Sequence, residues 1–267
     1  MDDIKLPIEV EKELKKISRV ASYLWQREWA ERNAGNISMN LTSFFDIEDI
    51  KNKTKNNQFV PFDFPKGVGG YVLFISGTGC YLRSLIDTIE EASCILYINN
   101  EATGYTIIWG GKTDHFGPTC ELISHSSIHL FNTKNNPTHL AVVHTHPLEL
   151  IVMSHHPLFD NEEELNRQIW MMCPEVRVFV PKGIHCTPYA LSSTAALAKV
   201  TIEAFKTRNV SLWEKHGATA TGEDAEKAWD YLDVANKGAK LLQMSWAAGF
   251  EPAGLSNEQL TELEQFI

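Results

Sequence analysis

The chain has 267 residues, a formal net charge of -10 and 43% hydrophobic residues, a composition typical of a folded globular protein with a substantial core. The acidic balance argues against broad binding to nucleic acid or to an anionic membrane, because both need clusters of Lys and Arg. Five cysteines without a CxxC pair predict neither a disulfide framework nor a thiolate zinc site. The N-terminus is charged and no apolar run approaches the ~20 residues of a membrane span, so we expect a cytoplasmic protein.

The first part of the chain predicts a helix followed by short strands. Apolar residues at helical spacing predict a long helix over 7–32, which ends at the turn sequence NAGN. A strand is expected at 37–42. Residues 43–70 are rich in Lys and Asn and are expected to form a long surface excursion, with light structure as the alternative. Runs rich in β-branched and aromatic residues predict three more strands, at 71–76, 93–99 and 104–110.

The remainder of the chain mixes helices with further short strands. The apolar run 139–146 and the run EVRVFVPKG (175–183) predict strands, and 210–222 predicts a short strand pair with glycines at its corners. Because the strands come in neighbouring groups with helices before, between and after them, we predict one α/β domain over 1–267 with a largely antiparallel sheet. The expected helices lie at 116–131 (after a turn), 147–155, 160–172, 191–208, 223–249 and 256–267.

Two histidines follow the apolar run in HLAVVHTHPL (139–148). On a strand, side chains two positions apart share a face, so His144 and His146 are expected side by side with Thr145 pointing away. That spacing suits one metal ion, and histidine is a common zinc ligand. A polar strand end without metal explains the pair equally well.

Other histidines compete for a metal. His125 and His129 are four residues apart on an expected helix and form a rival pair, whereas the adjacent His155 and His156 point their rings apart. A catalytic zinc needs three protein ligands and an open position, so the pair at the strand end requires a distant third ligand. His216, beside the turn at Gly217, is a plausible candidate, although a single histidine is more often packed or solvated.

Five segments follow one another along the chain: ERNAGNIS (31–38), FISGTGCYLR (74–83), GPTCELISH (117–125), HTHP (144–147) and EKHGATATG (214–222). Taken together in their order and spacing, they resemble the class II aldolase and adducin family. The resemblance extends over nearly the whole chain. It implies a three-layer α/β fold with a largely antiparallel sheet between helix layers, a homotetramer, and active sites at subunit interfaces.

The resemblance also implies roles for individual residues. It makes His144, His146 and His216 the ligands of one Zn²⁺ per subunit and Glu121 the catalytic acid/base. On its own, Glu121 is explained as a first-turn glutamate at a helix start, where a carboxylate is favoured electrostatically. Glu175 is similar to a glutamate that relatives present to a neighbouring subunit's substrate; a solvated residue at a strand start is the alternative.

Further segments are similar to the family's phosphate-binding segments. Small residues allow close backbone approach, and amide and hydroxyl donors can hold a phosphate without a positive surface; a tight turn is the simpler explanation of each glycine. Two cysteines depart from the family pattern. Cys120 replaces an expected serine, which weakens a side-chain donor, and Cys80 replaces an expected lysine. The phosphate-binding candidates are Asn33, Gly35, Asn36, Thr78, Gly79, Thr119 and Cys120.

The activity implied is the reversible cleavage of L-rhamnulose 1-phosphate to dihydroxyacetone phosphate and L-lactaldehyde. In that chemistry zinc stabilises an enediolate and Glu121 moves the proton. Cleavage of L-fuculose phosphate and 4-epimerisation of a pentulose phosphate are alternatives within the same family. A metal-free adducin-type interaction module is another alternative, but it is expected to lack the three histidines. The expected partner is a sugar phosphate, not nucleic acid or membrane.

Overall fold

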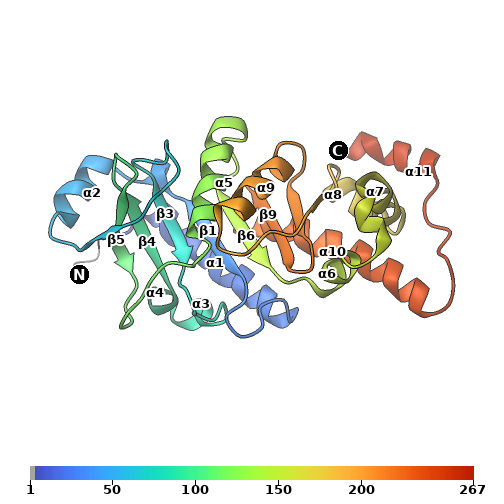
Figure 1. Cartoon of the computed structure of the whole chain (residues 1–267), viewed down its shortest axis with the longest axis horizontal. Helices are drawn as coiled ribbons and strands as arrows, with labels where there is room; N and C mark the ends of the chain where they lie inside the picture. The colour runs from blue at the N-terminus through green and yellow to red at the C-terminus, as the bar shows by residue number, and fades with distance from the viewer. Residues whose placement is uncertain (1–3) are drawn as a thin grey trace.

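The computed structural model describes residues 4–267, built around one nine-stranded sheet with the strand order β2-β5-β4-β3-β1-β6-β9-β8-β7 (Figure 1). Every neighbouring pair is antiparallel except β7 and β8, which run parallel. Among these residues no helix is both long and apolar enough to cross a membrane. The strands are β1 (Asn36–Asn40), β2 (Phe59–Pro61), β3 (Val72–Ser76), β4 (Ser93–Ile98), β5 (Gly104–Gly110), β6 (Ala141–Thr145), β7 (Ile184–Thr187), β8 (Val210–Trp213) and β9 (Gly217–Gly222).

Helices cover both faces of the sheet. On one face α10 (Ala225–Ala247) contacts β6 and β9 and packs against α1 (Ile8–Gln26) and α6 (Leu148–Met153). On the other face α5 (Leu122–Asn135) and α9 (Ala195–Phe205) pack together (Figure 1). The remaining helices are α2 (Ile47–Thr54), α3 (Ser84–Asp87), α4 (Ile89–Ala92), α7 (Glu162–Met171), α8 (Pro174–Phe179) and α11 (Asn257–Glu262), with short 3-10 turns at Thr42–Phe44, Pro157–Asp160 and Leu263–Phe266.

The alternation of side chains along the central strands explains the layering. On β3, Val72 and Phe74 join the core on the α1 side, whereas Leu73 and Ile75 join a second core on the opposite face. All four side chains are fully buried, as expected for a strand that is covered on both faces. The prediction of a three-layer α/β fold with a largely antiparallel sheet is therefore confirmed.

Some predicted elements differ from the structure. The predicted strand at 175–183 is wrong: residues Pro174–Phe179 form α8. Pro174 occupies the first helical turn, where its fixed φ favours a helix, and the extended Cys173 precedes it. The predicted helix over 7–32 ends earlier, at Gln26, because Glu28 adopts a positive φ of 61°. The excursion at 43–70 contains α2 and the edge strand β2.

Candidate active site

The HTHP sequence lies at the end of β6 in the middle of the sheet. Val142 faces α5 and α9, whereas Val143 belongs to the core on the α1 side, so alternation puts the His144 side chain on the α5 side. Thr145 points to the opposite face, where its hydroxyl donates to the backbone oxygen of Trp29 at 2.6 Å. The centroids of the His144 and His146 rings lie 5.3 Å apart. The strand therefore places both imidazoles together, with Thr145 as the spacer.

His216 joins this pair from the turn between β8 and β9. Its ring centroid lies 5.0 Å from that of His144 and 5.4 Å from that of His146, and one ligand nitrogen from each histidine lies within 4.8 Å of the others. The turn requires Gly217, because a Cβ there would lie 2.6 Å from the Thr145 carbonyl oxygen and 2.8 Å from His146 Cδ2. Three converging imidazoles are the ligand set of a catalytic zinc site with one open position.

Each imidazole in this histidine cluster is oriented through its Nδ1 atom. Such contacts fix the ring and leave Nε2 available as the metal ligand. The His146 contact is to a carboxylate, an arrangement that raises ligand basicity. The three contacts are His144 Nδ1 with Ala218 O (3.1 Å), His146 Nδ1 with Glu31 Oε1 (2.8 Å) and His216 Nδ1 with Ser192 Oγ (3.5 Å).

Burial keeps His144 and His216 in the protonation state that a metal needs. Desolvation lowers the pKa of His144 well below 6.5, with further lowering from His146 and His216. Desolvation, followed by the charge of His146, lowers the pKa of His216 to about 4. Neutral imidazoles at neutral pH bind a metal without first losing a proton.

Glu121 lies beside the cluster, at the residue that precedes the first turn of α5. It is buried, and its Oε2 atom lies 3.9 Å from His144 Nε2. Asn36 Nδ2 donates to the same oxygen at 2.8 Å. Burial raises the pKa of Glu121, against the lowering effects of the Asn36 hydrogen bond and His146. A raised carboxyl pKa next to a metal-binding cluster is typical of a general acid/base.

The structure brings the predicted phosphate-binding segments to the same end of the sheet. Asn36 pairs with His144 across β1 and β6. The Thr119 amide donates to the Ser76 carbonyl at 2.9 Å and the Thr78 amide to the Gly117 carbonyl at 2.8 Å. Of the seven candidates, Asn33, Thr78, Gly79 and Cys120 are exposed, Gly35 is half-buried, and Asn36 and Thr119 are buried.

Gly35 has two structural reasons to be glycine. Its φ is +77°, and a Cβ would lie 2.9 Å from the His144 carbonyl oxygen. Asn36, next to it, uses one of its two amide hydrogens for Glu121. Its side chain therefore belongs to the immediate surroundings of the carboxylate as well as to the phosphate candidates.

The remaining predicted residues lie in other contacts. Glu175 is exposed in the first turn of α8, hydrogen-bonded to Cys173 and 3.8 Å from Lys237 Nζ. The rival histidines, His125 and His129, both bond Ser38 instead of joining the cluster.

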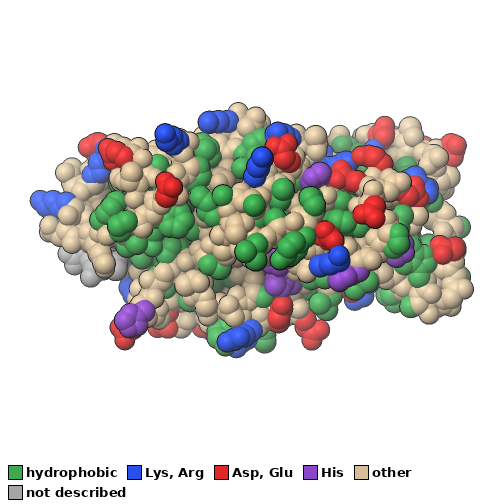
Figure 2. Space-filling view, viewed as in Figure 1, with side chains coloured by type: hydrophobic (Ala, Val, Ile, Leu, Met, Phe, Trp, Pro, Cys, Tyr) green, Lys and Arg blue, Asp and Glu red, His purple; other side chains and the backbone are tan. Residues whose placement is uncertain are grey.

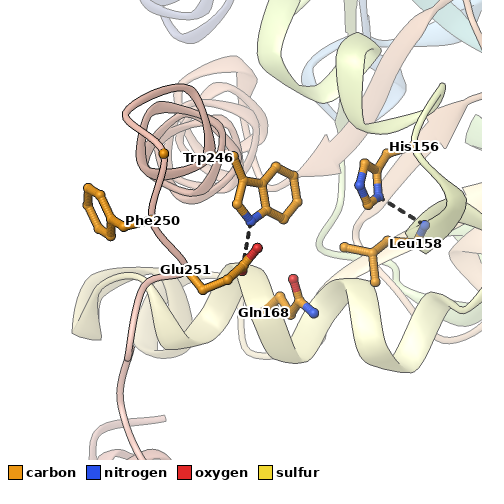
Figure 3. Close-up of a pocket in the computed structure, with 7 residues that line it drawn as sticks. His156, Leu158, Gln168, Trp246, Phe250 and Glu251 are labelled. Carbon is orange, nitrogen blue, oxygen red and sulfur yellow. Dashed lines mark hydrogen bonds between the residues drawn. The ribbon is translucent and has the colours of Figure 1, made fainter.

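A separate cavity of about 520 Å³ lies between α7 and the end of α10 (Figure 3). There the His156 and Trp246 rings stack with centroids 4.8 Å apart, and Trp246 Nε1 donates to Glu251 at 3.0 Å. None of the predicted site residues lines it in the described part of the chain. The cavity is lined by His156, Leu158, Gln168, Trp246, Gly249, Phe250 and Glu251.

Acidic and basic side chains are interspersed over the face of the molecule that Figure 2 shows.

Several residues that surround the histidine cluster and Glu121 were not predicted. Glu31 orients His146, Trp213 places its ring centroid 4.4 Å from that of His144, and Ser38 lies behind Asn36. Alternate residues of the strand NISMN share a face, so the sequence could have predicted that Ser38 lies on the same face of β1 as Asn36. Glu31 and Trp213 depend on contacts between separate segments, so no local pattern pointed to them.

Comparison with known proteins agrees with this geometry. Residues 15–242 match the family model described as class II aldolase and adducin N-terminal domain. The chain belongs to the class II aldolase and adducin family. A rhamnulose-1-phosphate aldolase from Bacteroides thetaiotaomicron is 37% identical, over 94% of this chain and 93% of that protein. One from Enterococcus faecalis is 30% identical, over 91% and 86% respectively. Family membership and these relatives identify the protein as an aldolase, a carbon–carbon lyase.

Solved structures show the same fold. A sugar-phosphate aldolase from Thermotoga maritima superposes with a TM-score of 0.77 at 28% identity, covering 92% of this chain and all of that one. An L-fuculose 1-phosphate aldolase superposes with a TM-score of 0.60 at 16% identity, covering 96% of each chain. The second similarity is one of fold alone.

Proposed function

We propose that this aldolase reversibly cleaves L-rhamnulose 1-phosphate to dihydroxyacetone phosphate and L-lactaldehyde. The observation that carries the proposal is a buried carboxylate 3.9 Å from one nitrogen of a cluster of three converging histidines. The names of the relatives that align over nearly the whole chain support the choice of substrate.

The metal that the cluster would hold is Zn²⁺, one per subunit, bound by His144, His146 and His216. Three imidazoles whose ligand atoms lie within 4.8 Å of one another fit the ligand set of such a site. When bound, the ion supplies a Lewis acid for the carbonyl of the ketose phosphate. The contacts of Glu31, Ser192 and Ala218 to the three Nδ1 atoms hold the imidazoles in place.

Glu121 is the acid/base of the proposed reaction. In cleavage the hydroxyl of the departing carbon loses its proton to solvent as the aldehyde forms, and protonated Glu121 gives a proton to the carbon left behind. In synthesis the carboxylate takes that proton back, and the new hydroxyl is protonated from solvent. The raised pKa supports this role, because a carboxyl group that ionises nearer neutral pH can be both donor and acceptor. Asn36 holds Oε2 by its hydrogen bond and so orients the carboxyl group.

The phosphate group is held by backbone amides and polar side chains of Asn33–Asn36, Thr78–Gly79 and Thr119–Cys120. These segments meet at the end of β1 and β3 that adjoins His144, which supports a phosphate within reach of the histidine cluster. Donors of this kind recognise a phosphate without a surplus of positive charge. The Cys120 backbone amide takes the place of the hydroxyl that serine would supply.

The wider proposal is that the whole chain acts as one domain in a cytoplasmic homotetramer with active sites at subunit interfaces. The exposed position of Glu175 in one chain fits contact with the substrate of a neighbouring subunit. The exposed apolar side chains of Tyr189 and Leu191 supply further surface for such an interface.

A coupled assay for dihydroxyacetone phosphate tests the proposed substrate. Zinc-loaded protein is compared on L-rhamnulose 1-phosphate, L-fuculose 1-phosphate and a pentulose phosphate, and again after chelation and zinc return. We expect the highest kcat/KM on L-rhamnulose 1-phosphate, with loss on chelation and recovery with zinc. A preference for L-fuculose 1-phosphate, epimerisation of the pentulose phosphate, or activity that survives complete metal removal would contradict the proposal.

A further inference from the structure

A buried strip of polar side chains runs from the active site into the interior between β1 and α5. We propose that His125, Ser38 and His129 form a positioning network that fixes the Asn36 amide and, through it, the Glu121 carboxyl group. The inference rests on the proposed function, in which Glu121 is the acid/base.

The hydrogen-bond directions in this network follow from the carboxylate. A carboxylate only accepts, so the atom of Asn36 that lies 2.8 Å from Glu121 Oε2 is the amide nitrogen, and Asn36 Oδ1 faces His125 Nε2. His125 Nε2 must then donate to that oxygen, which leaves His125 Nδ1 without a proton. The orientation of the amide that holds Glu121 is thus tied to one tautomer of His125.

The chain of donors continues beyond His125. Ser38 Oγ lies 2.6 Å from His125 Nδ1 and donates to it, and it accepts from His129 Nε2 at 2.7 Å. His129 Nδ1 is buried without a hydrogen-bond partner, as expected of a nitrogen without a proton, because an N–H there would be an unsatisfied donor. Every donor therefore points toward Glu121, from His129 through Ser38, His125 and Asn36.

Burial of these side chains prevents an alternative arrangement of the hydrogen bonds. His125 and His129 are 2% and 1% exposed and Ser38 is fully buried, so water cannot replace the bonds. Burial lowers the pKa of both histidines to about 3, and both stay neutral at neutral pH. Neither histidine belongs to the histidine cluster, so the buried pair positions the carboxyl group and does not bind the metal.

Two substitutions at one position separate positioning from packing. His125→Leu removes the donor to Asn36, whereas His125→Gln keeps an amide donor of similar reach. We expect His125→Leu to lower kcat for aldol cleavage about 100-fold, with zinc content within about threefold of wild type, because a misplaced reacting group costs on the order of 10² in rate. His125→Gln should recover most of the rate.

A double-mutant cycle with Glu121→Gln decides whether the network acts through Glu121. If it does, His125→Leu has no further effect on kcat once Glu121 is replaced. Multiplication of the two losses, or a loss from His125→Gln as large as that from His125→Leu, would overturn the inference. Should His125→Leu fail to fold, Ser38→Ala takes its place in the cycle, with an expected loss of severalfold in kcat and the same absence of a further effect.

Different measurements would refute the proposed function and the positioning network. Lack of aldol cleavage by the wild type, or full activity of Glu121→Gln, would refute the proposed function before any network variant is needed. A crystal structure of His125→Leu adds a readout that does not depend on turnover. We expect the Asn36 amide to turn or the Glu121 carboxyl group to move, and an unchanged position of both would overturn the inference.

Discussion

Glu121 Oε2 and His144 Nε2 lie 3.9 Å apart, with their side chains 5% and 2% exposed. This separation is longer than a hydrogen bond, so Asn36 and not His144 holds the carboxyl group directly. The carboxyl group thus stands beside the histidine cluster, close enough to exchange a proton with a molecule bound there.

The histidine cluster predicts a stoichiometric metal site. We expect His144→Ala and His216→Ala each to lose most of the zinc that the wild type retains after dialysis, because two imidazoles bind far more weakly than three. Metal analysis of the purified proteins measures this. His155→Ala, which removes an exposed histidine outside the cluster, is the matched control and should keep its zinc. Equal zinc content in His144→Ala and wild type would contradict the site.

The Glu31 carboxylate predicts a change in metal affinity without any loss of ligands. Because it lies 2.8 Å from His146 Nδ1, Glu31→Ala should weaken zinc binding about 10- to 100-fold, the usual effect of removing such a partner. Competition with a chelator of known affinity measures the change. Glu28→Ala, which removes a nearby exposed glutamate, should leave the affinity unaltered; an equal loss in both variants would indicate a general charge effect instead.

The buried histidines His125 and His129 predict a loss of stability in acid. Their folded pKa of about 3 lies below the unfolded value of 6.5, so the unfolded state takes up their protons first as the pH falls. Between these values each histidine should lower the free energy of unfolding by about 1.4 kcal/mol per pH unit. Urea denaturation of metal-free protein between pH 6 and pH 4 measures the slope.

His129→Gln supplies the control for this pH dependence. It keeps a donor for Ser38 but no longer titrates, so its slope should be shallower than that of the wild type by about 1.4 kcal/mol per pH unit. The same slope in both proteins would show that His129 does not stay neutral in the folded state.

Cys120 gives a chemical probe of the phosphate site. It is exposed and lies between two site residues, Thr119 and Glu121. N-ethylmaleimide should label it, and dihydroxyacetone phosphate at ten times its dissociation constant should slow the labelling about tenfold, because only free protein reacts. Cys120→Ser is the control: it should lose the label that dihydroxyacetone phosphate protects. Unprotected labelling of Cys120 would place the phosphate elsewhere.

The fold was largely predictable because apolar residues recur with a clear helical or strand period in most elements. The runs that became β3, β4 and β5 agree with the structure to within a residue at each end, since their residue types and turns leave little choice. The run at 175–183 failed because its alternating valines resemble a strand, whereas Pro174 and packing of Val176 against Gly238 of α10 favour a short helix. Such packing between distant segments has no local signal.

The site was predictable only in part for the same reason. The spacing of His144 and His146 is local, and the strand period correctly places both rings on one face. The partners that orient them come from other segments, as with Glu31, which lies 115 positions from His146. The buried pair His125 and His129 has a helical spacing that suits a metal equally well, and only the position of Ser38 opposite them shows another role.

Proton exchange of dihydroxyacetone phosphate in heavy water tests Glu121 as the acid/base most directly, because it needs no aldehyde. Zinc-loaded wild type should exchange one carbon-bound proton, and Glu121→Gln with the same zinc content and unfolding midpoint should exchange it at least about 100-fold more slowly. Exchange at the wild-type rate by folded, zinc-loaded Glu121→Gln would contradict the proposed role of Glu121.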